Sequence, residues 1–203
     1  PLAVLVLRGF LTHRAAGDVR AFLYAFFPAM ATTNLANTWI KRYVGRLRPF
    51  FYQRCGYDAS TFACTDDKDL LRQSFPSGHS SESMCALLFC TLFLLGKVKL
   101  RRSLLAPREE DREEEGVGQA DRGPSRLPFG LGAVRLAPAW AALATLPTCL
   151  SVWIACSRLR DDWHHPADVL AGLLLGASCA LFFYPCGFPP VFADDSHLPL
   201  VSP

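Results

Sequence analysis

The chain has 203 residues, enough for one compact domain with its own core. Hydrophobic residues make up 51% of it, and 15 residues are phenylalanine. The formal net charge of +3 is too small to suggest general nucleic-acid binding, and the charges are gathered in blocks between nearly uncharged stretches. This pattern indicates a membrane protein rather than a soluble globule.

Four segments have, or nearly have, the roughly 20 apolar residues that a transmembrane helix needs. In chain order they are Val19–Ile40, Ser80–Gly96, Leu136–Cys156 and Ala167–Tyr184. We interpret residues 1–18 as the end of a truncated upstream membrane helix and a loop, and residues 185–203 as a C-terminal tail. The sequence therefore predicts an all-α, polytopic transmembrane bundle.

Two polar loops of different character separate these helices. Lys41–Ser74 mixes basic residues with aromatics, prolines and two cysteines, Cys55 and Cys64. The two cysteines would pair if the loop faces an oxidising compartment. Lys97–Arg126 joins a charge run to a Gly/Pro/Ser stretch and is predicted to be a disordered linker, which its flanking basic residues would place in the cytoplasm.

With helices of alternating direction, the first and third end on the membrane face where the second and fourth begin. Lys41 and Arg48 lie there, about two helical turns apart, and Pro49 stops the helix. Arginine offers a planar fork for phosphate oxygens and lysine a compact charge. Taken alone, such a pair could also be basic residues at a helix end that reach to the membrane surface and anchor the helix there.

The second motif on this face is Ser77-Gly78-His79, directly before an apolar helix. A helix N-terminus presents unpaired N–H groups to an anion, and glycine permits close backbone approach. The hydroxyl of Ser77 adds a donor, and His79 can supply a proton near neutral pH. As an isolated pentapeptide with its preceding Phe-Pro, the motif could equally be a simple turn and helix cap.

The third motif contains Arg158, His164 and Asp168. Asp168 can accept a hydrogen bond from one imidazole nitrogen of His164 and leave the other nitrogen free to attack, as in hydrolase triads. Arg158 would again bind phosphate. A histidine near a carboxylate is often structural, but the three motifs together supply complementary parts on one face: cations, helix-terminal amides, an oriented nucleophile and an acid.

Lys-x6-Arg-Pro, Pro-Ser-Gly-His and Ser-Arg-x5-His-x3-Asp, in this order, resemble the signature of the type 2 phosphatidic acid phosphatase superfamily. The resemblance covers roughly Val19 to Tyr184 and is closest to the lipid phosphate phosphatase branch. It implies a phosphatase/haloperoxidase-type helical core with six membrane helices. We therefore expect the chain to lack the first of them and all or part of the second.

The same resemblance implies a mechanism that uses no metal or other cofactor. His164 would attack phosphorus to form a phosphohistidine, Asp168 would orient it, and His79 would act as the acid. The phosphate would be held by Lys41, Arg48, Ser77, Gly78 and Arg158. The expected substrates are phosphatidate, lysophosphatidate, a sphingoid phosphate or diacylglycerol pyrophosphate, taken from the bilayer on its lumenal or extracellular face.

Three alternatives remain open at this point. The chain could act on a polyprenyl diphosphate or another phosphate ester, or it could be a non-catalytic membrane protein that binds lipid phosphates. A metal site built from His79, His164, His165 and Asp168 is the third, although the surrounding cations would repel a metal. Glu82 departs from the resemblance, because relatives often carry an aromatic or small residue there. A carboxylate one turn into a membrane helix is costly unless it faces a partner or water.

Overall fold

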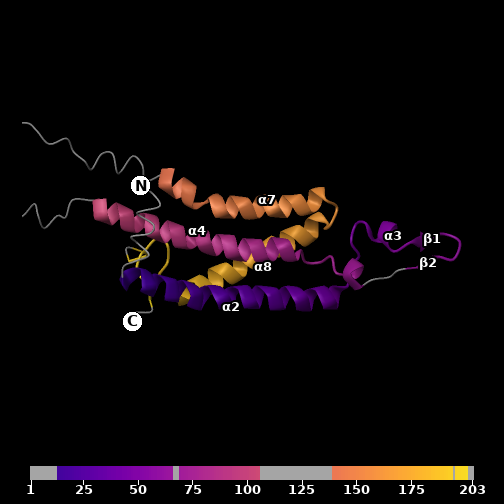
Figure 1. Cartoon of the computed structure of the whole chain (residues 1–203), viewed down its shortest axis with the longest axis horizontal. Coiled ribbons are helices and arrows are strands. Elements are labelled where there is room, and N and C mark those ends of the chain that lie inside the picture. Colours follow the sequence, from indigo (N-terminus) through magenta and orange to yellow (C-terminus); the bar gives the residue numbers. More distant parts are fainter. Residues whose placement is uncertain (1–12, 66–68, 106–138, 194, 201–203) are drawn as a thin grey trace, which may run out of the picture.

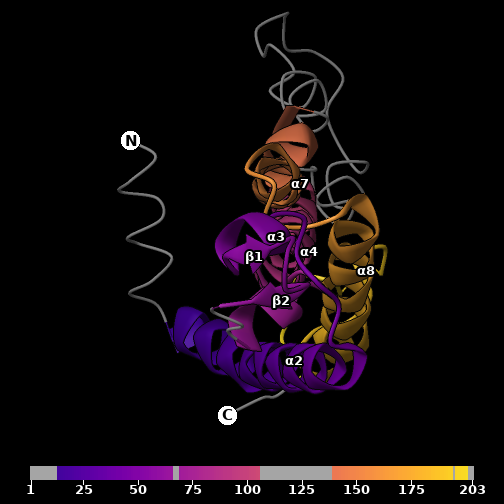
Figure 2. The same cartoon turned by 90° about the vertical axis from the view of Figure 1, so that its right-hand side faces the viewer.

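The computed structural model describes residues 13–65, 69–105, 139–193 and 195–200. Its long helices run along the longest axis of the molecule (Figure 1). They are α2 (His13–Val44), α4 (Gly78–Leu105), α7 (Leu146–Arg160) and α8 (Pro166–Phe183), and a helical segment over 139–144 precedes α7. In the end-on view of Figure 2, α4 lies inside the bundle, where it packs against α2, α7 and α8.

A small subdomain between α2 and α4 projects beyond one end of the bundle (Figure 1). It contains a short helix, a two-stranded hairpin and a 3-10 helix. These are α3 (Phe51–Arg54), β1 (Tyr57–Asp58), β2 (Ala63–Cys64) and η1 (Asp69–Arg72). The strands are antiparallel, with Tyr57 opposite Cys64. Among the described residues, this hairpin is the only sheet.

The inner face of α2 is built from small side chains at every fourth position. The buried residues of this stripe are Ala21, Ala25, Ala29, Thr33 and Asn37. Large side chains such as Tyr24, Phe27 and Trp39 lie exposed on the outside of the helix. Small residues at a helix contact allow backbones to approach closely, and an apolar outer surface is what a bilayer requires.

Glycines in α8 allow it to contact α4 over its first turns. A Cβ atom on Gly172 would lie 2.5 Å from the carbonyl oxygen of Ser77, and one on Gly176 would meet the carbonyl oxygen of Ser81. Any larger residue at these two positions would push the helices apart. This close contact matters for the site, because it holds the start of α4 beside the start of α8.

Three of the described helices are long and apolar enough to cross a membrane: Gly78–Val98, Ala139–Arg160 and Pro166–Cys186. They confirm the predicted fold class of an all-α bundle with several membrane helices. The α2 helix is 32 residues long, but it is not among these three. Membrane crossing by α2 therefore stays a prediction.

Two predicted boundaries are wrong. α2 begins at His13 rather than Val19, so residues 13–18 belong to the helix. α4 continues to Leu105, so the first part of the segment expected to be a disordered linker, residues 97–105, is helical. Lysine, arginine and leucine in this stretch are all good helix formers, which explains the extension. Residues 106–126 of that segment lie outside the described residues.

The C-terminal tail follows η2 (Tyr184–Cys186) and folds back on the bundle. A Cβ on Gly187 would meet the carbonyl oxygen of Ala21 at 2.7 Å, and Leu200 N–H donates to the carbonyl of Gly187. Lys97 pairs with Asp18 at 2.7 Å in the same region. The tail therefore covers the end of the bundle that lies opposite the three motifs.

Candidate active site

The three motifs come together where α2 and α7 end and α4 and α8 begin (Figure 1). Ser77 N–H donates to the carbonyl of Asp168 at 2.9 Å, which joins the second motif to the third. Arg46, within the first motif, forms an ion pair with Asp168 at 2.8 Å. His165 Nε2 lies 3.2 Å from the carbonyl oxygen of Leu47. The shared face inferred from helix direction is thus a contiguous site.

The chain enters this site through a turn at Gly45. Its φ of +58° favours glycine, and its N–H donates to the carbonyl of Lys41, which ends α2 with a left-handed cap. The following strand-like stretch pairs with the segment before α4. Ser74 N–H donates to Arg46 and Arg48 N–H donates to Leu71, each over 2.9 Å. This pairing carries the first motif back over the start of α4.

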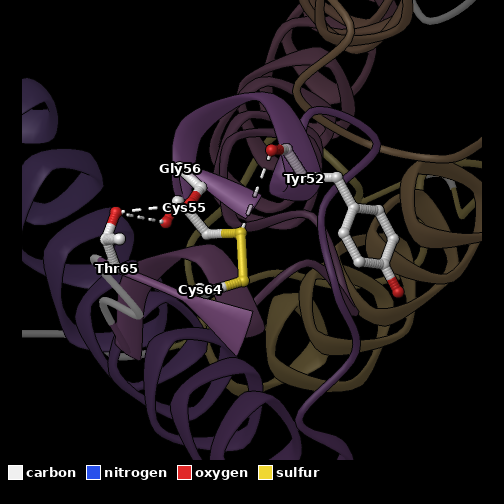
Figure 3. Close-up of a disulfide and its surroundings, with 5 residues drawn as sticks. All are labelled: Tyr52, Cys55, Gly56, Cys64 and Thr65. Carbon is white, nitrogen blue, oxygen red and sulfur yellow. Dashed lines mark hydrogen bonds between the residues drawn. A yellow bond between two sulfur atoms is a disulfide. The ribbon is translucent and has the colours of Figure 1, made fainter. Parts of the chain in front are cut away.

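A disulfide between Cys55 and Cys64 closes the projecting subdomain (Figure 3). The hydroxyl of Thr65 lies within hydrogen-bond distance of the Cys55 and Gly56 carbonyls, as Figure 3 shows. Cys55 is buried with Phe51 and Leu71 in a small core. The carbonyl of Leu71 also accepts the backbone hydrogen bond of Arg48, so the disulfide and this core support the loop that carries Arg48.

His164 is buried, and one of its ring nitrogens is already engaged. Nδ1 lies 2.8 Å from the carbonyl oxygen of Ser74. A carbonyl oxygen only accepts hydrogen bonds, so Nδ1 carries the proton and Nε2 keeps its lone pair. Burial, followed by the charge of Arg48, lowers the pKa of His164 to about 4. The imidazole is therefore neutral near pH 7 and has one free basic nitrogen.

Asp168 makes other contacts than the predicted hydrogen bond to His164. Its Oδ2 lies 3.8 Å from His164 Nδ1, beyond hydrogen-bond distance, because that nitrogen donates to the main chain of Ser74. The fully buried carboxylate instead accepts from the Ser74 hydroxyl at 2.5 Å and the His165 N–H at 3.0 Å, and it pairs with Arg46. The predicted direct hydrogen bond between His164 and Asp168 is therefore not formed, and Ser74 contacts both residues instead. An orienting role of Asp168 stays a prediction.

Arg48 is held by main-chain oxygens and an aromatic ring. Its Nε donates to Leu70 at 3.0 Å, and its terminal nitrogens lie 3.4 and 3.5 Å from the carbonyls of Trp163 and Gln73. The guanidinium also lies over the Trp163 ring, 5.1 Å from its centroid. None of these partners is a carboxylate, so the positive charge of Arg48 remains available to an anion.

The start of α4 forms a cradle with the end of α2. A Cβ on Gly78 would lie 3.1 Å from Asn37 Nδ2, which is a tight contact, and 3.5 Å from Lys41 Nζ, so both groups lie close to the helix start. Ser77 is fully buried, and its hydroxyl accepts from Ser80 at 2.9 Å. The first N–H groups of an α-helix have no partner within the helix, and they face an anion favourably.

Two predicted residues lie at the site without joining the network. His79, in the first turn of α4, is exposed, and its side chain has no hydrogen-bond partner within the described part of the chain. Arg158 is half-buried at the end of α7 and contacts Ser157 at 3.0 Å and Asp161 at 3.3 Å. Arg158 Nη1 has no hydrogen-bond partner within the described part of the chain.

Sequence reasoning missed Arg46, Ser74 and Trp163. Arg46 lies inside the first motif, and its position two residues before Arg48 would have been a usable signal. Ser74 contributes mainly through a carbonyl oxygen, which no side-chain pattern reveals. Trp163 stands directly before His164, and an aromatic beside several arginines is a recognisable signal for cation–π stacking.

Comparison with known proteins shows what this chain is similar to. Lipid phosphate phosphatase 2 of Arabidopsis thaliana is 28% identical over 98% of this chain and 61% of its own length. Diacylglycerol pyrophosphate phosphatase 1 of Saccharomyces cerevisiae is 30% identical over 84% of this chain and 52% of its own length. Phospholipid phosphatase 1 of Rattus norvegicus is 32% identical over 80% of this chain and 49% of its own length.

The chain thus spans about half to three fifths of the length of these relatives. No solved structure matches it. The family model described as the PAP2 superfamily matches residues 22–190, a range that contains all three motifs. The resemblance seen in the motifs is confirmed: the chain belongs to the PAP2 superfamily.

Proposed function

We propose that this chain carries the active site of a metal-independent lipid phosphate phosphatase that works through a phosphohistidine on His164. The observation that carries the proposal is the state of this imidazole. It is buried and neutral, its Nδ1 proton is held by the Ser74 carbonyl, and cations and a helix N-terminus surround it. A neutral imidazole with one fixed lone pair is suited to nucleophilic attack.

The phosphate would be bound by five groups that converge from three motifs: Lys41, Arg48, Ser77, Gly78 and Arg158. Phosphoryl transfer depends mostly on positioning and on stabilising charge over the equatorial oxygens. Several cations and helix-terminal amides can supply that stabilisation in place of a metal ion. Arg158 Nη1, which has no partner among the described residues, and the nearness of Lys41 to Gly78 support this assignment.

In the first step, His164 Nε2 attacks phosphorus as the bond to the lipid oxygen breaks, and His79 donates its proton to the leaving alkoxide. In the second step, His79 removes a proton from water, the resulting oxygen attacks phosphorus, and the P–N bond breaks to release inorganic phosphate. The exposed position of His79 at the start of α4 supports a role that needs contact with water.

Phosphatidate, lysophosphatidate, a sphingoid phosphate or diacylglycerol pyrophosphate would fit a site at the end of apolar helices. The names of the relatives, which include a lipid phosphate phosphatase and a diacylglycerol pyrophosphate phosphatase, support this class. The headgroup would bind at the lumenal or extracellular surface of the membrane, with the acyl chains remaining among the helices.

The test is phosphate release from phosphatidate by the full chain in detergent, with excess chelator and a His164→Ala control. We expect chelator-resistant release by the wild type and none by the variant. Release by folded His164→Ala would contradict the nucleophile. Release only from a polyprenyl diphosphate would change the substrate class, and tight lipid phosphate binding without release would identify a non-catalytic relative.

A further inference from the structure

Glu82 lies beside the phosphate cradle, yet the mechanism above does not use it. It is half-buried in α4, one helical turn after Gly78. Its Oε1 would lie 3.8 Å from a Cβ on Gly78, a position that Lys41 Nζ approaches to 3.5 Å. Among the described residues, no cation lies within ion-pair distance of Glu82. Its carboxylate therefore borders the site without a paired charge.

The carboxylate also opens onto a groove that runs along the outer face of α2. The groove has a volume of about 1070 Å³ and is lined mainly by apolar side chains of that helix, such as Phe27, Leu35 and Trp39. Glu82 is its acidic lining residue and comes from α4, while Arg42 is the basic one. The groove thus joins an apolar surface, suited to a lipid chain, to a negative charge next to the phosphate cradle.

An ionised carboxylate at this depth of a membrane helix is unfavourable unless it has a partner. Lys41 is the site cation whose charge interacts with that of Glu82. Burial and the charge of Arg48 lower the pKa of Lys41, and Glu82 and Asp168 act in the opposite direction. Once Lys41 contacts a substrate phosphate, however, its charge is shared with that dianion. Glu82 can then accept a positive group from the substrate itself.

We propose that Glu82 is a specificity-determining residue that binds the ammonium group of a lipid phosphate whose amine lies two carbons from the phosphate ester, as in a phosphorylated sphingoid base. This inference rests on the proposed function of the same site. The geometry matches, because four residues from Gly78 to Glu82 rise about 6 Å along the helix, close to the span of a two-carbon aminoalkyl phosphate and one hydrogen bond. Phosphatidate offers no cation at this place.

A different role for Glu82 would be to weaken phosphate binding by partly neutralising Lys41. The two roles give different results. Charge neutralisation of Lys41 changes the affinity for every lipid phosphate alike, whether or not it carries an amine. Recognition of an ammonium changes only the substrates that possess one, so the ratio between a charged and an uncharged version of the same lipid distinguishes them.

The experiment compares sphingosine 1-phosphate with its N-acetyl derivative, which keeps the phosphate and the long chain but removes the positive charge. The full chain is assayed in lipid nanodiscs as wild type, as Glu82→Gln and as Asp195→Asn, an exposed carboxylate in the distant tail. We expect wild type to prefer the amine about tenfold in kcat/KM, equal to about 1.4 kcal/mol. Glu82→Gln should reduce the ratio to about one, and Asp195→Asn should retain it.

A ratio that Glu82→Gln leaves unchanged would overturn the proposal, as would an equal gain for both lipids. Binding separates this result from failure of the proposed function. In a His164→Ala background, both lipids are titrated against the emission of Trp39 in the groove, with Trp39→Phe to assign the signal. A preference for the amine that Glu82→Gln removes would support the proposal even if no variant released phosphate. Equal binding of both lipids would overturn it.

Discussion

Replacing Ser74 with alanine tests how His164 is positioned. Ser74 is fully buried, its carbonyl oxygen accepts from His164 Nδ1 at 2.8 Å, and its hydroxyl donates to Asp168 at 2.5 Å. The variant keeps the main-chain carbonyl of residue 74 but removes the hydroxyl that donates to the buried carboxylate of Asp168. A hydrogen bond to a charged group is worth about 1.5–3 kcal/mol. Since Arg46 and the His165 N–H remain on Asp168, we expect the lower end of this range.

If that loss appears in the transition state, kcat falls about tenfold, because about 1.4 kcal/mol corresponds to a factor of ten in rate. KM should stay within about twofold, since the Ser74 side chain does not reach the phosphate cradle. The assay is initial-rate phosphate release from phosphatidate in detergent, with thermal unfolding to establish that the variant is folded. Ser83→Ala is the control, because its hydroxyl contacts the Ser80 carbonyl and the Ser151 hydroxyl and bonds neither His164 nor Asp168.

If Asp168 oriented His164 directly, removal of the Ser74 hydroxyl would leave that contact in place, and kcat would match the wild type. A folded Ser74→Ala protein with unchanged kcat would therefore refute the indirect arrangement. A rise in KM with constant kcat would instead place Ser74 in substrate binding.

Three further predictions follow from the described contacts. Because burial lowers the pKa of His164 to about 4, an NMR titration should show a neutral imidazole down to that pH, and kcat/KM should lose the nucleophile only as pH falls through about 4 rather than 6.5. Gly172→Ala should lower stability by about 1–3 kcal/mol in thermal unfolding, since its Cβ would meet the Ser77 carbonyl. Replacing Cys55 and Cys64 with serine should cost about 2–3 kcal/mol, and reductant should shift the wild-type unfolding midpoint to match the variant.

The closeness of the three motifs could be predicted from the sequence, because it depends only on the order and alternating direction of the helices. Alternating helices bring every second helix end to one face, so Lys41, Gly78 and His164 had to lie near one another. The contact between α4 and α8 follows the same logic, since Gly172 and Gly176 permit close helix packing. Fold class and the location of the site depend on such patterns.

The hydrogen-bond partner of His164 could not be predicted in this way. The spacing of His164 and Asp168 allows a direct contact, and the observed 3.8 Å separation is only about 1 Å too long for one. Which group accepts the hydrogen bond of His164 Nδ1 depends on where the loop before α4 places the Ser74 carbonyl. That placement comes from backbone pairing with Arg46, a contact between distant segments that carries no sequence signal.

The buried carboxylate also explains how the cations of the site divide their roles. Arg46 pairs with Asp168 and balances its charge, so this arginine serves the framework. Arg48 is fixed by carbonyl oxygens and Trp163, which hold it in place without cancelling its charge. Lys41 has no ion pair within the described residues and lies beside the free N–H groups of α4. A dianionic phosphate would thus meet the fixed Arg48 and the more adaptable Lys41, with Arg158 as the third cation of the proposed site. His164, being neutral, adds no positive charge of its own.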